Sequence, residues 1–80
     1  MNTTLEELIS LLKEVRDDID YTTEKALIDG NVLDSFDILQ IVNILSEEYD
    51  ISIPAKDIQP ENFNSAEALL ALVTRILEGD

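Results

Sequence analysis

Apolar residues recur at spacings of three and four in three separate stretches of the chain, and charged residues fill the positions between them. This period is that of an α-helix with one face buried and the other in water. The pattern therefore predicts three amphipathic helices. They are expected over residues 3–17, from Asp34 or Ser35 to about Tyr49, and from Asn64 to about Leu77.

Residues typical of helix ends support the outer boundaries. Thr3 or Thr4 can cap the first helix, because a glutamate follows each of them three positions later and completes a capping box. Asn64 is expected to cap the last helix by pairing with Glu67. Gly79 is a typical terminator of that helix.

The apolar faces of the three helices define the expected aliphatic core. In the last helix this face comprises Ala66, Leu69, Leu70, Val73, Ile76 and Leu77. The core as a whole is expected to contain Leu5, Leu8, Ile9, Leu12, Val15, Ile38, Ile41, Val42, Leu45, Tyr49, Leu69, Val73 and Ile76.

Two connecting segments lack a helical period. Residues 18–33 are long for a connection in a small bundle, where about 2 to 8 residues suffice, and apolar anchors such as Tyr21 predict a packed loop. Pro54 suits the first position of a short helix over residues 54–58, which Pro60 ends. The sequence thus predicts an all-α fold, a four-helix bundle with three main helices, one short helix and a long first loop.

The chain is strongly acidic, with 18 aspartates and glutamates against 5 lysines and arginines and a formal net charge of −13. Such a chain cannot neutralise phosphates, which excludes DNA, RNA and anionic membrane surfaces as partners, whereas basic proteins are attracted. Hydrophobic residues make up 45% of the sequence, too many for a disordered acidic tail. We expect one monomeric domain over residues 1–80.

Cysteine and histidine are absent from the sequence. The chain therefore offers no disulfide, thiol nucleophile, thiolate metal site or imidazole base. A bundle of this size also has little room for a cleft that would shift the pKa of two carboxylates. No apolar run approaches the roughly 18 residues of a membrane span. These observations predict a cytoplasmic protein that has no metal site and is not an enzyme.

The candidate chemistry lies at the expected start of the second helix. Ser35 is at a helix N-terminus, where free backbone N–H groups and the positive end of the helix dipole favour a phosphate ester. Asp34 and Ser35 are also both strong N-cap residues. Position alone therefore leaves two interpretations open, a phosphate attachment site and a helix cap.

The wider sequence context resembles the acyl carrier protein family over nearly the whole chain. That family has an Asp-Ser-Leu core, a Glu-Glu-aromatic end to the helix that follows, an Ile-Pro before a short third helix, and a Phe and a capping residue before the last helix. The matching residues here are Asp34-Ser35-Phe36, Glu47-Glu48-Tyr49, Ile53-Pro54 and Phe63-Asn64-Ser65.

The resemblance implies that Ser35 carries a covalent 4′-phosphopantetheine arm, which a phosphopantetheinyl transferase attaches from coenzyme A with the support of Asp34. The arm would supply the thiol that the chain lacks. The second helix becomes the element that partner enzymes recognise, because its acids can meet their basic docking patches. The residues expected to contact partners are Phe36, Asp37, Leu39, Gln40, Asn43, Glu47 and Glu48.

The implied function is a carrier that presents an acyl or aminoacyl thioester to enzymes of fatty acid, lipid or secondary-metabolite biosynthesis. Phe36, Gln40 and Asn43 depart from the pattern of fatty-acid-synthesis carriers. The run Val32-Leu33-Asp34-Ser35 is closer to D-alanyl and other stand-alone aminoacyl carriers, which work with an adenylating ligase. The class of cargo therefore stays open between acyl and aminoacyl groups.

Two other classes of function were compared with the carrier. A cofactor-free acidic helical adaptor that binds a basic protein explains the fold and the charge equally well, but it leaves the placement of Asp34-Ser35 to chance. A calcium-binding protein is disfavoured, because Asp18, Asp20 and Asp29-Gly30 do not meet the ligand spacing of an EF-hand loop.

Overall fold

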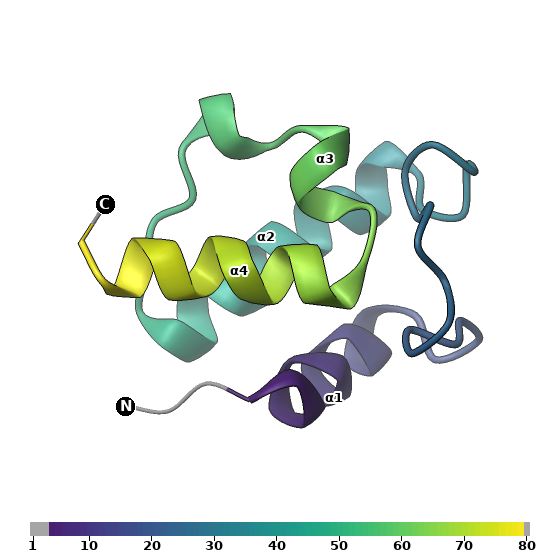
Figure 1. Ribbon diagram of the computed structural model, residues 1–80, viewed down its shortest axis with the longest axis horizontal. Helices are drawn as coiled ribbons and strands as arrows, with labels where there is room; N and C mark the ends of the chain where they lie inside the picture. Colours follow the sequence, from purple (N-terminus) through teal and green to yellow (C-terminus); the bar gives the residue numbers. More distant parts are fainter. Residues whose placement is uncertain (1–3, 80) are drawn as a thin grey trace.

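The computed structural model describes residues 4–79, and these form four α-helices and one short 3-10 turn (Figure 1). The helices are α1 (Leu5–Val15), α2 (Ser35–Tyr49), α3 (Pro60–Phe63) and α4 (Ala66–Leu77), and the turn η1 covers Ala55–Asp57. No strand occurs among the described residues. The predicted all-α fold class with three main helices is confirmed.

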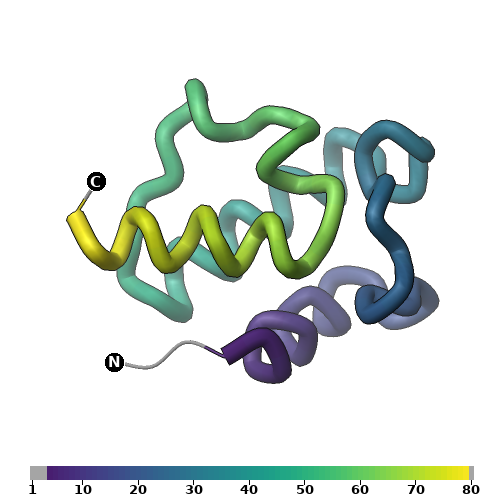
Figure 2. The backbone as a smooth tube through the Cα atoms, viewed as in Figure 1, coloured from purple at the N-terminus to yellow at the C-terminus, as the bar shows by residue number. Residues whose placement is uncertain are grey.

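The helices pack around α1 and α4. Helix α1 packs against both α2 and α4, and α3 packs against α4. In the view of Figure 1, α2 lies behind α4 and runs from the right of the molecule toward the left. Figure 2 shows that the long connection from α1 to α2 follows one end of the molecule, while the chain from α2 to α3 arches above α4. The start of α2 thus lies at the end covered by the long connection.

The ends of α1 and α2 carry the capping residues that the sequence predicted. The Thr4 hydroxyl accepts a hydrogen bond from the backbone N–H of Glu7 at 3.2 Å, and the alternative cap Thr3 lies outside the described residues. Helix α2 begins at Ser35, with Asp34 as its N-cap. Asp50 is its C-cap, with a left-handed backbone (φ 53°), and the N–H groups of Asp50 and Ile51 both donate to the carbonyl of Ser46.

The cap of α4 differs from the prediction. Ser65 is the N-cap, and its hydroxyl accepts a hydrogen bond from the N–H of Ala68 at 3.0 Å. Asn64 faces the long connection instead. The predicted terminator is confirmed, because Gly79 follows the last turn with φ 89° and donates its N–H to the carbonyl of Ile76.

The predicted short helix over residues 54–58 is wrong in position. Only the 3-10 turn η1 forms there, and Pro54 precedes it. Pro60 does not end a helix but occupies the first position of α3, where its fixed φ fits and its missing N–H costs no hydrogen bond. The residue before a proline is held in extended conformation, as Gln59 is (φ −132°, ψ 154°), which separates the two elements.

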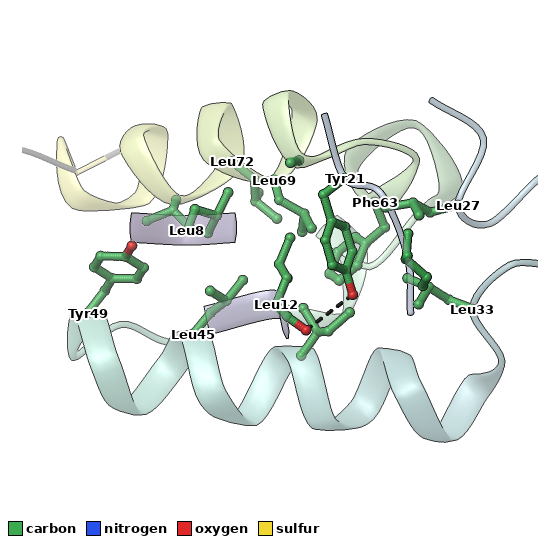
Figure 3. Packing of buried hydrophobic residues seen from close by; sticks show 14 residues of the cluster. Leu8, Leu12, Tyr21, Leu27, Leu33, Leu45, Tyr49, Phe63, Leu69 and Leu72 are labelled. Atoms are coloured by element: carbon green, nitrogen blue, oxygen red, sulfur yellow. Dashed lines mark hydrogen bonds between the residues drawn. The ribbon is translucent and has the colours of Figure 1, made fainter. Parts of the chain in front are cut away.

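The core contains only part of the predicted set (Figure 3). The predicted residues that are buried are Leu8, Leu12, Ile41, Leu45, Tyr49, Leu69 and Val73, whereas Leu5, Ile9, Val15, Ile38, Val42 and Ile76 are only partly buried. Ala66 is buried as expected for the predicted apolar face of the last helix. The buried residues that the core prediction left out are Ile19, Tyr21, Leu27, Leu33, Phe63 and Leu72. Most of these lie outside the main helices, where no helical period points to them.

Helix α4 is rotated relative to its predicted face. Leu72 is fully buried, while Leu77, which the prediction placed on the apolar face, is 40% exposed. Both stripes have helical spacing, so the period alone does not choose between them. The contacts of α4 with α1 and α3 determine which stripe is buried.

The long connection is packed at both ends, as predicted. Near its start, the Tyr21 hydroxyl lies within hydrogen-bond distance of two carbonyl oxygens, that of Arg16 at 2.8 Å and that of Leu12 at 3.1 Å. Figure 3 shows the bond to Leu12. Near its end, the side-chain oxygen of Asn64 accepts hydrogen bonds from the N–H groups of Ile28 and Asp29, each at 3.0 Å. The connection is therefore fastened both to α1 and to the junction of α3 and α4.

We predict that Asn64→Ala lowers the free energy of unfolding by about 2 kcal/mol, because the N–H groups of Ile28 and Asp29 lose their acceptor and the former is partly buried. Urea denaturation measures the change. The matched control is Asn43→Ala on the exposed face of α2, which we expect to shift stability by less than about 0.5 kcal/mol. Equal losses in the two variants would contradict the anchoring role of Asn64.

We also predict that Tyr21 makes stability depend on alkaline pH. Burial raises the pKa of Tyr21 from 10.0 to about 12, so the folded state keeps a phenol proton that the unfolded state loses. The resulting stability is complete below pH 10 and is lost as the pH rises from 10 toward 12. Tyr21→Phe should flatten this decline, as measured by denaturation at each pH.

At neutral pH the same variant should lose about 1 kcal/mol, because the hydrogen bonds of the hydroxyl disappear. Tyr49→Phe is the control. The buried Tyr49 hydroxyl has no hydrogen-bond partner among residues 4–79, so its removal should cost nothing at pH 7. If Tyr49→Phe lowered the free energy of unfolding at pH 7 more than Tyr21→Phe does, the stabilising role of the Tyr21 hydrogen bonds would be refuted.

Candidate functional site

The chain reaches α2 through a tight turn at Gly30 and Asn31. The N–H of Gly30 donates to the carbonyl of Ala26 at 2.7 Å, and a Cβ at Gly30 would come within 2.7 Å of the same oxygen. Asn31 adopts the left-handed backbone conformation, with φ 57°. The turn reverses the chain and leads it through the buried Leu33 into the start of α2.

Ser35 is the first residue of α2, and its side chain is exposed. Its hydroxyl makes no hydrogen bond to any part of the chain between residues 4 and 79. The first N–H groups of an α-helix have no partner within the helix and carry partial positive charge. The hydroxyl is therefore exposed at a helix N-terminus, the kind of position at which proteins bind phosphate groups.

A reciprocal capping box surrounds Ser35 and explains why its hydroxyl is free. The Asp34 carboxylate accepts a hydrogen bond from the N–H of Asp37 at 2.8 Å, and the Asp37 carboxylate accepts one from the N–H of Asp34 at 3.3 Å. Asp34 thus acts as the cap, and of the two cap residues that the sequence offered, Ser35 is not used. The aspartate three residues after Asp34 is a sequence signal for this box.

Asp37 does not lie where the sequence analysis placed it. It was expected on the partner-binding face, but it is only 7% exposed. Its carboxylate oxygen lies 2.7 Å from Nη1 of Arg16, which also approaches the carbonyl of Val32 at 3.4 Å. A carboxylate inside the fold needs a cation beside it, and Arg16 provides one. We therefore leave Asp37 out of the partner-binding surface.

Arg16 is a residue of the site that sequence reasoning missed. Its guanidinium binds two carboxylates at once, because Nε and Nη2 donate to the oxygens of Asp18 at 2.9 and 2.8 Å while Nη1 binds Asp37. Arg16 holds the pKa of Asp18 below its usual value, and the two carboxylates together raise the pKa of the guanidinium. The first helix was expected to run to residue 17, so Arg16 counted as one of its polar positions, and no signal in the sequence distinguished it.

The other residues expected to contact partners are exposed on α2. Phe36 is 64% and Leu39 58% exposed, unusual values for large apolar side chains. Along α2 toward its C-terminal end, two neutral polar residues come after Leu39, and two glutamates come after those. The exposed polar and acidic members of this face are Gln40, Asn43, Glu47 and Glu48. The face is thus apolar near Ser35 and acidic near the end of α2.

A small cavity lies behind the start of α2. Its volume is about 60 Å³. The residues that line it come from the long connection, from α2 and from the segment around α3. They are Ile28, Ile38, Ile58, Gln59, Pro60 and Phe63.

Two further observations concern other kinds of site. Within residues 4–79, no group of three or more acidic side chains could hold a metal ion. In the same part of the chain, no helix has the length and apolar character needed to cross a bilayer.

Comparison with known proteins gives one informative similarity. The chain is 34% identical over 54 residues to a protein of Serratia sp. named "Probable acyl carrier protein PigG". The match covers 68% of this chain and 62% of that relative, so the chain spans less than two thirds of the length of the protein it matches. None of the protein-family models matches the chain. Neither does any solved structure at a significant level.

The similarity agrees with the fold and with the site. The name of that relative describes a carrier protein and not an enzyme, in agreement with the prediction of a protein that is not an enzyme. The helical arrangement and the exposed serine that begins α2 are those that the sequence motifs led us to expect. Taken with this similarity, they support the acyl carrier protein family as the family of this chain.

Proposed function

We propose that this chain holds an acyl or aminoacyl group on a 4′-phosphopantetheine arm attached to the hydroxyl of Ser35, and that it presents this group to partner enzymes. The observation that carries the proposal is the state of Ser35 itself. Its hydroxyl is exposed and unbonded at the start of α2, because Asp34 has taken over the role of cap. A serine that served only as a cap would have its hydroxyl bound to the backbone.

The residues around Ser35 fit such an arm. The first turn of α2 favours the negative phosphate diester beside the serine. Only one oxygen of the Asp34 carboxylate is bound to the backbone of Asp37, which leaves the other for a metal ion of the transferase. When bound, the arm supplies the thiol that carries the cargo as a thioester, in a chain that contains no cysteine.

The exposed face of α2 is our proposed docking surface for the transferase, for a loading ligase and for enzymes that process the cargo. We define it by Phe36, Leu39, Gln40, Asn43, Glu47 and Glu48. Phe36 and Leu39 provide apolar contacts close to Ser35. The acids attract basic patches over a distance, which speeds association and selects partners while leaving the contacts reversible. A carrier that visits several enzymes needs such short-lived contacts.

The cavity behind α2 favours a small cargo. Its volume of about 60 Å³ is well below the roughly 150 Å³ of a cavity that holds benzene. A long fatty acyl chain would need the residues that line this cavity to move apart before it could enter. An aminoacyl or short acyl group can stay in solvent at the end of the arm. We therefore favour an aminoacyl or short acyl cargo, for which the loading enzyme would be an adenylating ligase.

Incubation with coenzyme A, Mg²⁺ and a phosphopantetheinyl transferase should raise the intact mass of the protein by one phosphopantetheinyl group. Ser35→Ala should show no increase, because the attacking hydroxyl is gone. The matched control is Ser52→Ala, which removes another exposed hydroxyl, and it should be modified like the wild type.

Two results would contradict the proposal. An unmodified wild-type protein would favour the cofactor-free adaptor, and a modified Ser35→Ala protein would show that another residue carries the arm. Circular dichroism of each variant confirms that the helices are present.

The cargo is tested by the amide chemical shifts of the loaded protein. Attachment of a short acyl group from its coenzyme A ester should leave the signals of Ile38, Ile58 and Phe63 as they are in the protein with the free arm. Signals near Ser35 should move in both forms and serve as the internal control. Large shifts at the cavity residues with a short cargo would refute the solvent-exposed arrangement.

A further inference from the structure

We propose that Arg16 is a positioning residue for the modification of Ser35. This inference rests on the proposed function, because it concerns the reaction that attaches the arm. Arg16 makes no hydrogen bond to Ser35 and lies outside the docking surface. It would act through Asp37, by fixing the backbone on both sides of the serine.

The first step concerns the segments that Arg16 joins. It directly follows α1, where its N–H donates to the carbonyl of Leu12, so its backbone belongs to the end of that helix. Its side chain reaches Asp18 in the long connection, the Val32 carbonyl just before α2, and Asp37 in the first turn of α2. One guanidinium therefore links the end of α1, both ends of the connection and the start of α2.

The second step leads from Arg16 to the serine. The same Oδ2 atom of Asp37 accepts hydrogen bonds from Nη1 of Arg16 at 2.7 Å and from the N–H of Asp34 at 3.3 Å. The N–H of Asp37 in turn donates to Asp34 at 2.8 Å. Ser35 lies between these two aspartates in the chain. Its backbone is therefore held on both sides as long as the Asp37 carboxylate keeps its inward position.

The third step is the dependence of Asp37 on Arg16. A carboxylate that is 7% exposed has given up most of its hydration, and the guanidinium replaces it. Without Arg16 the carboxylate would be drawn out to water. Its bond to the N–H of Asp34 would then break, and the first turn of α2 would lose half of its capping box.

The sign of the charge separates positioning from electrostatic attraction. Arg16→Met makes the chain one unit more negative, which should leave its association with a basic transferase unchanged or faster. Asp37→Asn makes the chain one unit less negative. If both variants are modified more slowly, the common cause is the lost ion pair and not the net charge.

The experiment follows the rate at which the transferase modifies the full chain. The Ser35 oxygen forms a bond to the phosphorus of the arm, the pyrophosphate bond of coenzyme A breaks, adenosine 3′,5′-bisphosphate leaves, and the hydroxyl proton passes to solvent. We expect kcat/KM to fall on the order of tenfold for Arg16→Met and for Asp37→Asn, because the reacting oxygen is held less firmly. The double variant should be no slower than either single one.

The matched control is Arg75→Met, which removes the same side chain and the same charge. Arg75 belongs to the last turn of α4, where it pairs with Asp57 at 3.6 Å. The C-terminal end of α4 and the start of α2 lie at opposite sides of the view in Figure 1. The modification rate of this variant should stay within about twofold of the wild type, since exposed ion pairs contribute little. Arg16→Lys should recover part of the rate, because one ammonium can reach Asp37 but cannot bind both carboxylates as the guanidinium fork does.

A second readout needs no enzyme. Backbone hydrogen exchange at Asp34 and Asp37 should speed up in Arg16→Met and stay unchanged in Arg75→Met, at a temperature where both proteins are folded. Hydrogen exchange reports directly on the capping box on either side of Ser35, and it does so without the transferase. Should Arg16→Met not fold, Asp37→Asn with the same exchange measurement takes its place.

The outcomes of the test are distinct. A wild-type chain that is never modified overturns the proposed function. A modified wild type with Arg16→Met as fast as Arg75→Met, or with unchanged exchange at Asp34 and Asp37, overturns only the role of Arg16. Opposite rate changes in Arg16→Met and Asp37→Asn would also overturn it, because the effect would then follow the net charge.

Discussion

The carboxylate of Asp37 lies inside the protein and requires a cation there, and the arrangement of the molecule around Ser35 depends on how Arg16 meets this requirement. The helices α1 and α2 are joined by a long connection, which by itself leaves their relative position free. The packing of α1 against α2 restricts that position, and the ion pair restricts it further, because a displacement of either helix would separate the carboxylate from its cation. The start of α2 thus has a defined position against the end of α1.

The long connection completes the core as well as joining two helices. The connection contributes four buried side chains, Ile19, Tyr21, Leu27 and Leu33. In Figure 3, Tyr21, Leu27 and Leu33 lie together with Phe63 at one end of the core. The backbone of the connection needs hydrogen-bond partners there, and Asn64 supplies them from the junction of α3 and α4. The long connection therefore links Ser35 to the core, because it contributes buried side chains to the core and leads directly into the start of α2.

Local signals were enough to predict the main helices and the serine, and long-range contacts account for the rest. Helical period and capping residues act within four positions, so α1, α2 and α4 appeared in the sequence with small errors at their ends. The role of Asn64 depends on N–H groups 35 and 36 positions away in sequence, and the inward turn of Asp37 on an arginine 21 positions away. No local pattern reports such contacts. Ser35 was placed correctly at an exposed helix start, and its modification stays a prediction.

The uneven distribution of side chains along α2 has a geometric consequence for any partner that docks there. The apolar contacts begin at Phe36 and the acids end at Glu48, and twelve residues of helix separate them by roughly 18 Å. A partner that uses both regions must carry its basic patch at that distance from its active-site entrance. Since two fixed points define a direction, such a partner is also oriented along the helix. The helix would then select partners by the distance between their basic patch and their active-site entrance, as well as by the strength of their charge.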